Sequence, residues 1–546
     1  MSSDLQVHGG LGGRSRQVSW SAVAAIACVI GACAVAGGVY GSRLGSAKAA
    51  SARDSVQDDV REFQAVLGLV EENYAEVPRS DALIYDGAIP AMLQKLDPHS
   101  MFFNPEAFAR LREDQRGSYA GVGMLIRPYY GETIVDYPFP GTPAFEAGIR
   151  PSDAIVEVDD VSMAGVDFEE VAQRVRGPDG TSVHLTLRRQ GVDDLIEIDV
   201  IRANIPRPSL PLAFFVDQKV GYIKITNFGE TTGNELDDAL DRLEKDGLEG
   251  LVLDLRSNQG GLLTGGVRVA DRFLDRGQTI VSHRGRVSDE SVYKVRRGQK
   301  ADPYPMAVLV NCGSASAAEI VAGALQDHDR ALIVGTNTFG KGLVQSVFDL
   351  PNSTGLVLTT ARYYTPSGRL IQRHYDNGAG GSYYRYYADP CDPNYEPLNE
   401  DPRLTDSGRA VYGGAGITPD VRLPPITLDA FQRRLRDRRA FEGYAQQFSL
   451  RTPTLPENWD LTASVIADFR EYLEEEGIPF TEADFETSLP HIRRMLKKHI
   501  YTAVADYDEG MRVDTVLDPA VRRAIELLPE ARALLQGRTT ESAPGD

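Results

Sequence analysis

Residues 306–320 read MAVLVNCGSASAAEI, and this stretch decides how we interpret the fold. The apolar run favours a buried strand, the small residues a tight turn, and the following alanines a helix that begins near Ala317. Backbone N–H groups and the positive end of the dipole at a helix amino terminus stabilise developing negative charge. Ser314 and Ser316 are therefore candidate nucleophiles, although a serine in this place can also simply cap the helix.

The same alternation of strand and helix extends outward from this stretch. We predict strands at 221–227, 251–255 and 332–334, and helices at 233–245, 265–274 and 317–325. This order is typical of a mixed α/β sheet with crossover helices. Residues 254–261, DLRSNQGG, follow one of these strands, at the end where such sheets place their sites. The glycines there let backbone N–H groups approach a ligand closely.

A second candidate group is Lys341, which is flanked by glycines and enters a predicted strand. Gln345 lies four residues later, so both side chains should face the same side of that strand, where the amide could orient the amine. Burial lowers the pKa of a lysine, and the neutral amine can then act as a base. A Ser–Lys pair could thus perform acyl transfer without a histidine.

The amino terminus contains an apolar stretch, residues 18–40, which is preceded by Arg14 and Arg16. It is long enough to cross a hydrocarbon core of about 30 Å, and the arginines favour a cytoplasmic start. Residues 47–49 resemble a signal-peptidase site, so residues 1–50 form either a cleaved signal peptide or an uncleaved membrane anchor. We favour the anchor because the apolar run is long. Both forms place the rest of the chain in the periplasm or at the extracytoplasmic face of the membrane.

Composition sets further limits on the function. The chain has 546 residues, enough for about three domains, and its 78 acidic against 58 basic residues argue against nucleic-acid binding. The four cysteines lack CxxC spacing and the eight histidines form no HExxH pair, so we expect neither a metal nor another cofactor. Cys312 and Cys391 could form a disulfide, but we expect them as free or buried thiols.

The rest of the chain divides by pattern. Residues 51–116 have helical spacing, and residues 117–205 change to short strands and glycines. Residues 374–415, rich in Tyr, Gly, Asp and Pro, interrupt the α/β pattern as an inserted loop. Residues 425–546 return to amphipathic helices, such as 463–475 and 491–507, and end in a tail.

Taken together, these segments resemble the C-terminal processing peptidases, or tail-specific proteases, a family of Ser–Lys serine proteases with a PDZ domain. The resemblance covers about residues 60–373 and returns at 416–420. It is carried by five segments: 96–100 (LDPHS), 255–261 (LRSNQGG), 313–317 (GSASA), 339–342 (FGKG) and 363–369 (YYTPSGR). It implies a multidomain mixed α/β fold. The parts are a helical region at 51–116, a β-sandwich or barrel-like PDZ module at 117–205, a crotonase-like α/β protease core at 206–424 with the inserted loop 374–415, and a helical region at 425–546.

The resemblance also implies roles for particular residues. Ser316 matches the nucleophile, Lys341 the general base and Gln345 the residue that orients the base. The oxyanion hole would use the N–H of Ala317 and the N–H of either Gly260 or Gly261, a choice that the sequence leaves open.

In the PDZ module, the implied carboxylate-binding loop is Gly121-Val122-Gly123-Met124. Its N–H groups would bind the terminal carboxylate of a peptide that adds as a strand. The expected partners are therefore protein or peptide substrates with a free carboxyl terminus. The membrane is a further partner if the anchor is retained. A second copy of the chain, in a homo-oligomer, is also considered as a partner.

The expected function is that of an exported or membrane-anchored serine endopeptidase, which binds a substrate carboxyl terminus and cleaves upstream through an acyl-enzyme. One alternative is a catalytically inactive adaptor that binds peptides, which the intact Ser316, Lys341 and Gln345 oppose. A second alternative is a crotonase-like carrier or isomerase, whose chemistry fits neither a PDZ module nor a buried lysine.

Overall fold

The computed structural model describes residues 56–129, 131–189, 191–287, 289–298, 304–373, 402–425 and 427–541. The chain forms two compact units, one that ends at Ile89 and one that begins at Pro90. In the first unit, residues 56–73 are helical, and α2 (Ser80–Ala82) leads into a π-helical turn, Leu83–Ala88. The apolar stretch 18–40 lies outside the described residues. Among the residues that are described, no helix is long and apolar enough to cross a membrane.

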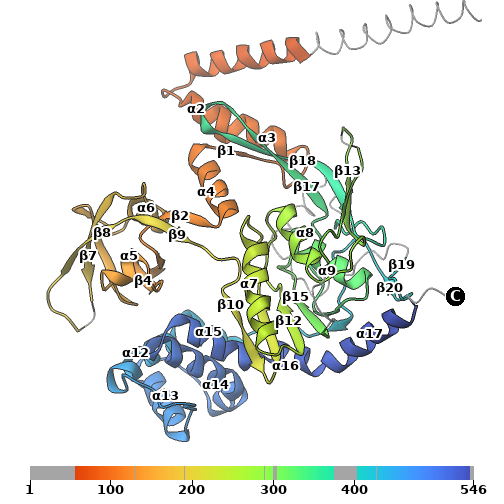
Figure 1. Ribbon diagram of the computed structural model, residues 1–546. Coiled ribbons are helices and arrows are strands. Elements are labelled where there is room, and N and C mark those ends of the chain that lie inside the picture. Colours follow the sequence, from red (N-terminus) through yellow and green to blue (C-terminus); the bar gives the residue numbers. More distant parts are fainter. Residues whose placement is uncertain are drawn as a thin grey trace, which may run out of the picture. The chain divides into compact units, whose positions relative to one another are not determined.

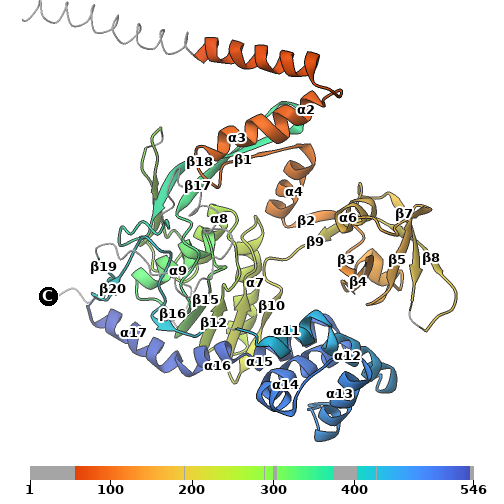
Figure 2. The ribbon, with the colours of Figure 1, turned by 180° about the vertical axis from the view of Figure 1, so that it is seen from behind.

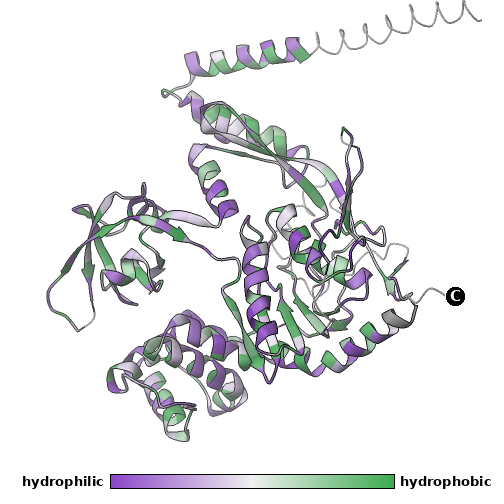
Figure 3. Ribbon diagram, viewed as in Figure 1, coloured by the Kyte–Doolittle hydropathy of each residue, from purple (hydrophilic) through white to green (hydrophobic). Residues whose placement is uncertain are grey.

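A six-stranded sheet lies at the centre of the second unit (Figure 1). Its order is β10 (Leu212–Asp217), β11 (Val220–Lys224), β12 (Gly250–Asp254), β15 (Met306–Val310), β16 (Leu332–Gly335) and β21 (Val421–Arg422). Neighbours from β11 to β21 are parallel, and β10 pairs antiparallel at the edge. Every residue of β12 and β15 is buried, as expected for parallel strands covered on both faces, and Figure 3 shows them as largely hydrophobic.

Helices cover both faces of this sheet. On one face lie α7 (Thr232–Lys245), α8 (Leu263–Asp271) and α9 (Ala317–Asp327), whose apolar residues share a core with alternate residues of β12 and β15. The other alternate residues of these strands contact α16 (Pro519–Glu526) and α17 (Leu528–Glu541) (Figure 2). The end of the carboxyl-terminal helical region therefore closes the second face of the central sheet.

A second sheet supports the loops at the carboxyl ends of the central strands. Its order is β1 (Met101–Phe103), β18 (Gly355–Tyr364), β13 (Thr279–Arg284) and β14 (Ser291–Lys294), and β17 (Leu343–Asp349) also pairs with β18. The short strand β1 interrupts a region that the sequence predicts to be helical. It is a strand because its backbone pairs with β18, with Met101 opposite Val357.

Residues 118–206, which include helix α6 (Phe168–Val175), form a separate β module with its own apolar core. Its main sheet runs β3 (Met124–Tyr129), β4 (Glu132–Pro138), β5 (Ala154–Val158), β7 (Ser182–Arg188) and β8 (Ile196–Ile201), with β6 (Val161–Ser162) on β5. β2 (Ser118–Gly121) and β9 (Ala203–Pro206) pair at the entry and exit of the module, and α5 spans Pro143–Glu146. β3 lies at the edge of the main sheet, so one side of its backbone can accept a further strand.

The carboxyl-terminal helices before α16 enclose another apolar core. They are α11 (Ala430–Asp437), α12 (Ala440–Arg451), α13 (Ala463–Glu475), α14 (Glu482–Val504) and α15 (Tyr507–Val516). α13 has the predicted bounds. α14 begins before the predicted start because the Thr481 side chain caps it, and the helix continues through Pro490.

The described end of the inserted loop, residues 402–415, contains a two-stranded ladder of β19 (Arg403–Leu404) and β20 (Ala410–Val411). Arg409 holds it to the core around the central sheet, through Asp329 at 2.6 Å and Asp420 at 2.7 Å. The preceding part of the loop, residues 374–401, lies outside the described residues.

Candidate active site

Ser316 lies between the end of β15 and the start of α9, as the sequence predicts. Its backbone has a φ of 55° and a ψ of −115°, a conformation that costs energy for any residue other than glycine. The Ser316 N–H donates to the Glu319 carboxylate at 2.8 Å. This sharp turn places the serine on the wall of a cavity of about 590 Å³.

Ser314 occupies a different environment. Its side chain is fully buried, and its hydroxyl donates to the carbonyl of Leu255 at 2.8 Å. The same oxygen accepts from the N–H of Asn311 at 3.0 Å. Ser314 therefore ties the turn to the end of β12, while Ser316 lines the cavity.

The glycine loop after β12 lies against the turn at Ser316. A Cβ atom on Gly260 would lie 2.7 Å from the Ser316 Cβ and 3.1 Å from the Ala317 nitrogen, so only glycine fits there. The Gly260 N–H already donates to the side chain of buried Asn258 at 2.8 Å. In the part of the chain that the structure describes, neither the Gly261 N–H nor the Ala317 N–H has a protein acceptor. These two N–H groups are thus available to a ligand in the cavity.

Lys341 lines the same cavity as Ser316. Burial lowers the pKa of Lys341, and the carboxylates of Glu319 and Asp97 oppose this shift only in part. The lysine does not lie in a strand, however. β17 begins at Leu343, and a β-bulge falls between Val344 and Gln345. The predicted reason for a shared side, strand alternation over four residues, is therefore wrong, although both side chains line the cavity.

Gln345 is fixed by a loop from the amino-terminal side of the second unit. Its side-chain nitrogen donates to the carbonyl of His99 at 2.5 Å. Asp97 in turn accepts from the N–H groups of His99 and Ser100, both at 2.8 Å, which shapes this loop. Burial and the charge of Lys341 lower the pKa of His99 to about 4. The loop 96–100 therefore forms part of the surroundings of Lys341 and Gln345.

Glu319, which was not among the predicted site residues, joins the turn at Ser316 to the loop of Lys341. The carboxylate is fully buried and accepts hydrogen bonds from the N–H groups of Ser316, Gly340 and Lys341, at 2.8, 2.7 and 2.9 Å. The hydroxyl of Thr338 donates to it at 2.5 Å. Burial raises the pKa of Glu319, and these hydrogen bonds offset the rise only in part. The spacing Ser-x-x-Glu at a helix start was the signal available in the sequence.

Tyr363 provides a second connection between the same segments. Its hydroxyl lies 3.1 Å from the carbonyl oxygen of Ser316 and 2.5 Å from that of Lys341. The tyrosine ring is buried in the core below the cavity. Tyr363 therefore fixes the distance between the backbones of the candidate nucleophile and the candidate base.

A buried charge network links the glycine loop to the carboxyl-terminal helices. Asp254 is fully buried, and burial opposes its ionisation, but the charges of Arg256 and Lys224 outweigh this and hold its pKa at about 2. Arg256 also donates to Asp518, the residue that caps α16, at 3.1 Å. Asp518 accepts a further bond from Arg494 of α14 at 3.1 Å. The helices that the resemblance does not cover thus contact the base of the candidate oxyanion loop.

In the β module, Gly121 ends β2 and Met124 begins β3, with Val122 and Gly123 between them. Among the described residues, no protein acceptor contacts the N–H groups of Val122 and Gly123. Gly123 has a φ of 82°, and a Cβ atom there would lie 2.3 Å from that of Thr142, so this position requires glycine. The loop stands beside the edge strand, where an added peptide strand would end.

The expectation that Cys312 is a free or buried thiol is wrong. Cys312 is disulfide-bonded.

Comparison with known proteins identifies the class to which this fold and site belong. The sequence model of peptidase family S41 matches residues 219–378, and that of the PDZ domain matches residues 134–189. A carboxy-terminal-processing protease of Bartonella bacilliformis is 39% identical over 315 residues, which cover 57% of this chain and 72% of the relative. The carboxy-terminal processing protease CtpA of Bacillus subtilis is 36% identical over 327 residues, 60% of this chain and 69% of the relative.

Among solved structures, the photosystem II D1 C-terminal processing protease is 30% identical, with a TM-score of 0.36, and the match covers 66% of this chain and 86% of that one. The chain belongs to the family of carboxy-terminal processing proteases. It is a serine-type endopeptidase with a PDZ domain, and the predicted family, fold class and enzyme class are confirmed.

Proposed function

We propose that the protein cleaves peptide bonds with a Ser316–Lys341 dyad. The single observation that carries this proposal is the shared cavity, which brings Ser316, a desolvated Lys341 and Gln345 together with the loop of Gly260 and Gly261. A lysine whose pKa is lowered by burial is neutral more often at a given pH and can take a proton from a serine.

In the proposed mechanism, neutral Lys341 removes the proton of the Ser316 hydroxyl as its oxygen attacks the substrate carbonyl. The N–H groups of Ala317 and Gly261 stabilise the oxyanion, a choice between the two glycines supported by the hydrogen bond that already occupies the Gly260 N–H. Protonated Lys341 then gives its proton to the departing amine, which leaves an ester on Ser316. A water molecule, deprotonated by Lys341, hydrolyses this ester and restores the serine.

In this scheme Gln345 is a positioning residue. The donation of its amide nitrogen to His99 fixes the side chain, and its amide oxygen is the acceptor that would orient the Lys341 amine. The adaptor alternative has no comparable support. An adaptor would not need a buried lysine, whose desolvation costs stability without any benefit to peptide binding.

We further propose that the PDZ loop Gly121–Met124 reads the free carboxyl terminus of substrates. For the intact enzyme, kcat/KM should be at least about tenfold higher for a peptide with a free acid than for its amidated twin, because amidation removes a charge that accepts hydrogen bonds from N–H groups. Steady-state kinetics on such a pair measures this ratio. Deleting residues 117–205 should remove the difference in kcat/KM between the two peptides. Equal rates on the two peptides in the intact enzyme would contradict carboxylate recognition and leave the PDZ domain with a scaffold role.

We also propose that the protein is exported and anchored by residues 18–40. The disulfide at Cys312 supports this, because disulfides persist in oxidising compartments outside the cytoplasm. In a bacterial host, a carboxyl-terminal tag on the full chain should be digested when protease is added to intact spheroplasts. The tag should also stay with the membrane after a carbonate wash. A variant without residues 1–50 is the control, and protection of the full-length tag would contradict export.

A further inference from the structure

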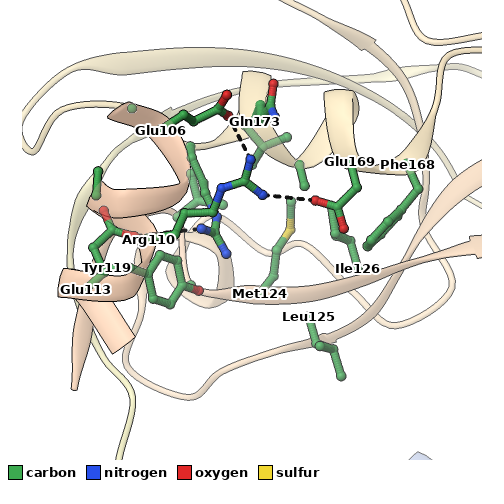
Figure 4. A pocket seen from close by; sticks show the side chains of 17 residues that line it. Glu106, Arg110, Glu113, Tyr119, Met124, Leu125, Ile126, Phe168, Glu169 and Gln173 are labelled. Carbon is green, nitrogen blue, oxygen red and sulfur yellow. Dashed lines mark hydrogen bonds and ion pairs between the residues drawn. The ribbon is translucent and has the colours of Figure 1, made fainter. Parts of the chain in front are cut away.

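A cavity of about 530 Å³ lies between the edge strand β3 and helix α6 of the PDZ domain, and helix α4 (Pro105–Arg116) forms its third wall (Figure 4). Its lining includes apolar side chains of β3 and α6, among them Met124, Ile126 and Ala172. If the PDZ domain reads carboxyl termini, as proposed above, this cavity is where the end of the substrate would lie. The inference that follows rests on that proposal.

The chain itself supplies a cation to this cavity. Arg110 of α4 donates to Glu106 on the same helix at 2.9 Å and to Glu169 on α6 at 3.3 Å, as Figure 4 shows. The side chains of Arg110 and Glu169 are 41% and 64% exposed, and ion pairs this exposed contribute little to stability. Glu113 adds another carboxylate to the α4 wall, but it pairs at 3.8 Å with Arg176, the second arginine of the lining. The two carboxylates that hold Arg110, Glu106 and Glu169, thus favour a cation that is easily exchanged.

The geometry indicates which substrate residue would meet Glu169. The end of α6 lies at the carboxylate loop, since a Cβ atom on Gly121 would lie 3.9 Å from the Cγ of Arg176. Glu169 precedes Arg176 by seven positions, roughly 10 Å along a helix that rises 1.5 Å per residue. A strand advances about 3.3 Å per residue. Glu169 therefore lies level with the residue about three positions before the substrate's last residue.

We infer that Glu169 is a specificity residue of the PDZ groove, which selects substrates with lysine or arginine about three positions before the carboxyl terminus. The substrate cation takes the place of Arg110 on the Glu169 carboxylate, and apolar residues at the very end of the substrate contact the floor formed by Met124 and Ile126. Without substrate, Arg110 therefore occupies the position on Glu169 that the lysine or arginine of the substrate would take.

The test measures binding to the full chain with Ser316→Ala, so that the probe is not cleaved. The probe is a dye-labelled ten-residue peptide with three apolar residues at a free carboxyl terminus and either Lys or Glu in the preceding position. Fluorescence anisotropy should give an affinity about three- to tenfold higher for the lysine peptide. Moving the lysine by two positions in either direction should reduce this preference.

Two matched variants separate the local contact from the net charge. Glu169→Gln should abolish the lysine preference. Glu170→Gln should retain it, because Glu170 pairs with Arg174 at 2.8 Å and does not line the cavity. Equal affinities for the two peptides, or a preference that survives Glu169→Gln, would overturn the inference. An amidated lysine peptide tests the carboxylate proposal separately. A loss of affinity on amidation without any lysine preference would contradict the role of Glu169 and still support recognition of the carboxylate.

Discussion

Replacing Ser316 with alanine is expected to lower kcat/KM for peptide cleavage by about 10⁶-fold, the size of the loss when a serine protease loses its nucleophile. The reason is that Ser316 lines the same cavity as Lys341 and lies beside the N–H groups of Ala317 and Gly261. Discontinuous assays with long incubation and mass-spectrometric detection of product can measure a loss of this size.

Ser314→Ala is the matched control, two residues away in the same turn. It should keep most of the activity and instead lower stability by about 1–3 kcal/mol, because it removes the buried hydrogen bonds to Leu255 and Asn311. The thermal unfolding midpoint of each variant shows whether it is folded. Equal loss of activity in both folded variants would contradict the assignment of the nucleophile.

Lys341→Arg and Lys341→Met are both expected to reduce kcat/KM by about 10³-fold or more, because neither side chain can accept the proton of Ser316. Arginine keeps the positive charge and cannot deprotonate in a protein. In the wild type, kcat/KM should rise with pH and level off above the pKa of Lys341, which burial places below the usual value of about 10.4. His99 cannot account for this rise above neutral pH, since its pKa is about 4.

The same shift predicts a pH effect on stability, and its sign follows from proton counting. Between the lowered pKa of Lys341 in the folded state and its ordinary pKa in the unfolded state, the unfolded chain binds more protons, so stability rises with pH. Lys341→Met should lack this dependence and should be at least as stable as the wild type below that window, because a buried charge is gone.

Substantial activity of Lys341→Arg, or a pH–rate profile that Lys341→Met leaves unchanged in shape, would mean that another residue is the base.

The sequence predicted the local parts of the site well. The step from β15 through the turn to Ala317 follows from neighbouring residues alone: an apolar run, small turn residues and a helix start. The same holds for α13, whose predicted and observed bounds agree at Ala463–Glu475. Such features depend on periodicity and capping over about ten residues, which a single sequence displays.

The features that the sequence did not predict depend on distant partners. β1 is a strand because β18 pairs with it, and three residues carry too little pattern to reveal this. The bulge at Gln345 shifts the strand register, so strand alternation does not explain why Lys341 and Gln345 face the same side. Both residues nevertheless line the cavity. Likewise, the amphipathic pattern of α16 shows that one face is apolar but not that this face covers the protease sheet.

The most direct test of the proposed dyad is to identify the residue that carries the acyl group. The full chain would be mixed with an activated ester of a substrate peptide, quenched with acid within the first turnover, digested and mapped by mass spectrometry. The account predicts the acyl mass on Ser316 in the wild type and its absence in Lys341→Arg. An acyl group on Ser314 or elsewhere, or full turnover with Ser316 unmodified at every quench time, would contradict it.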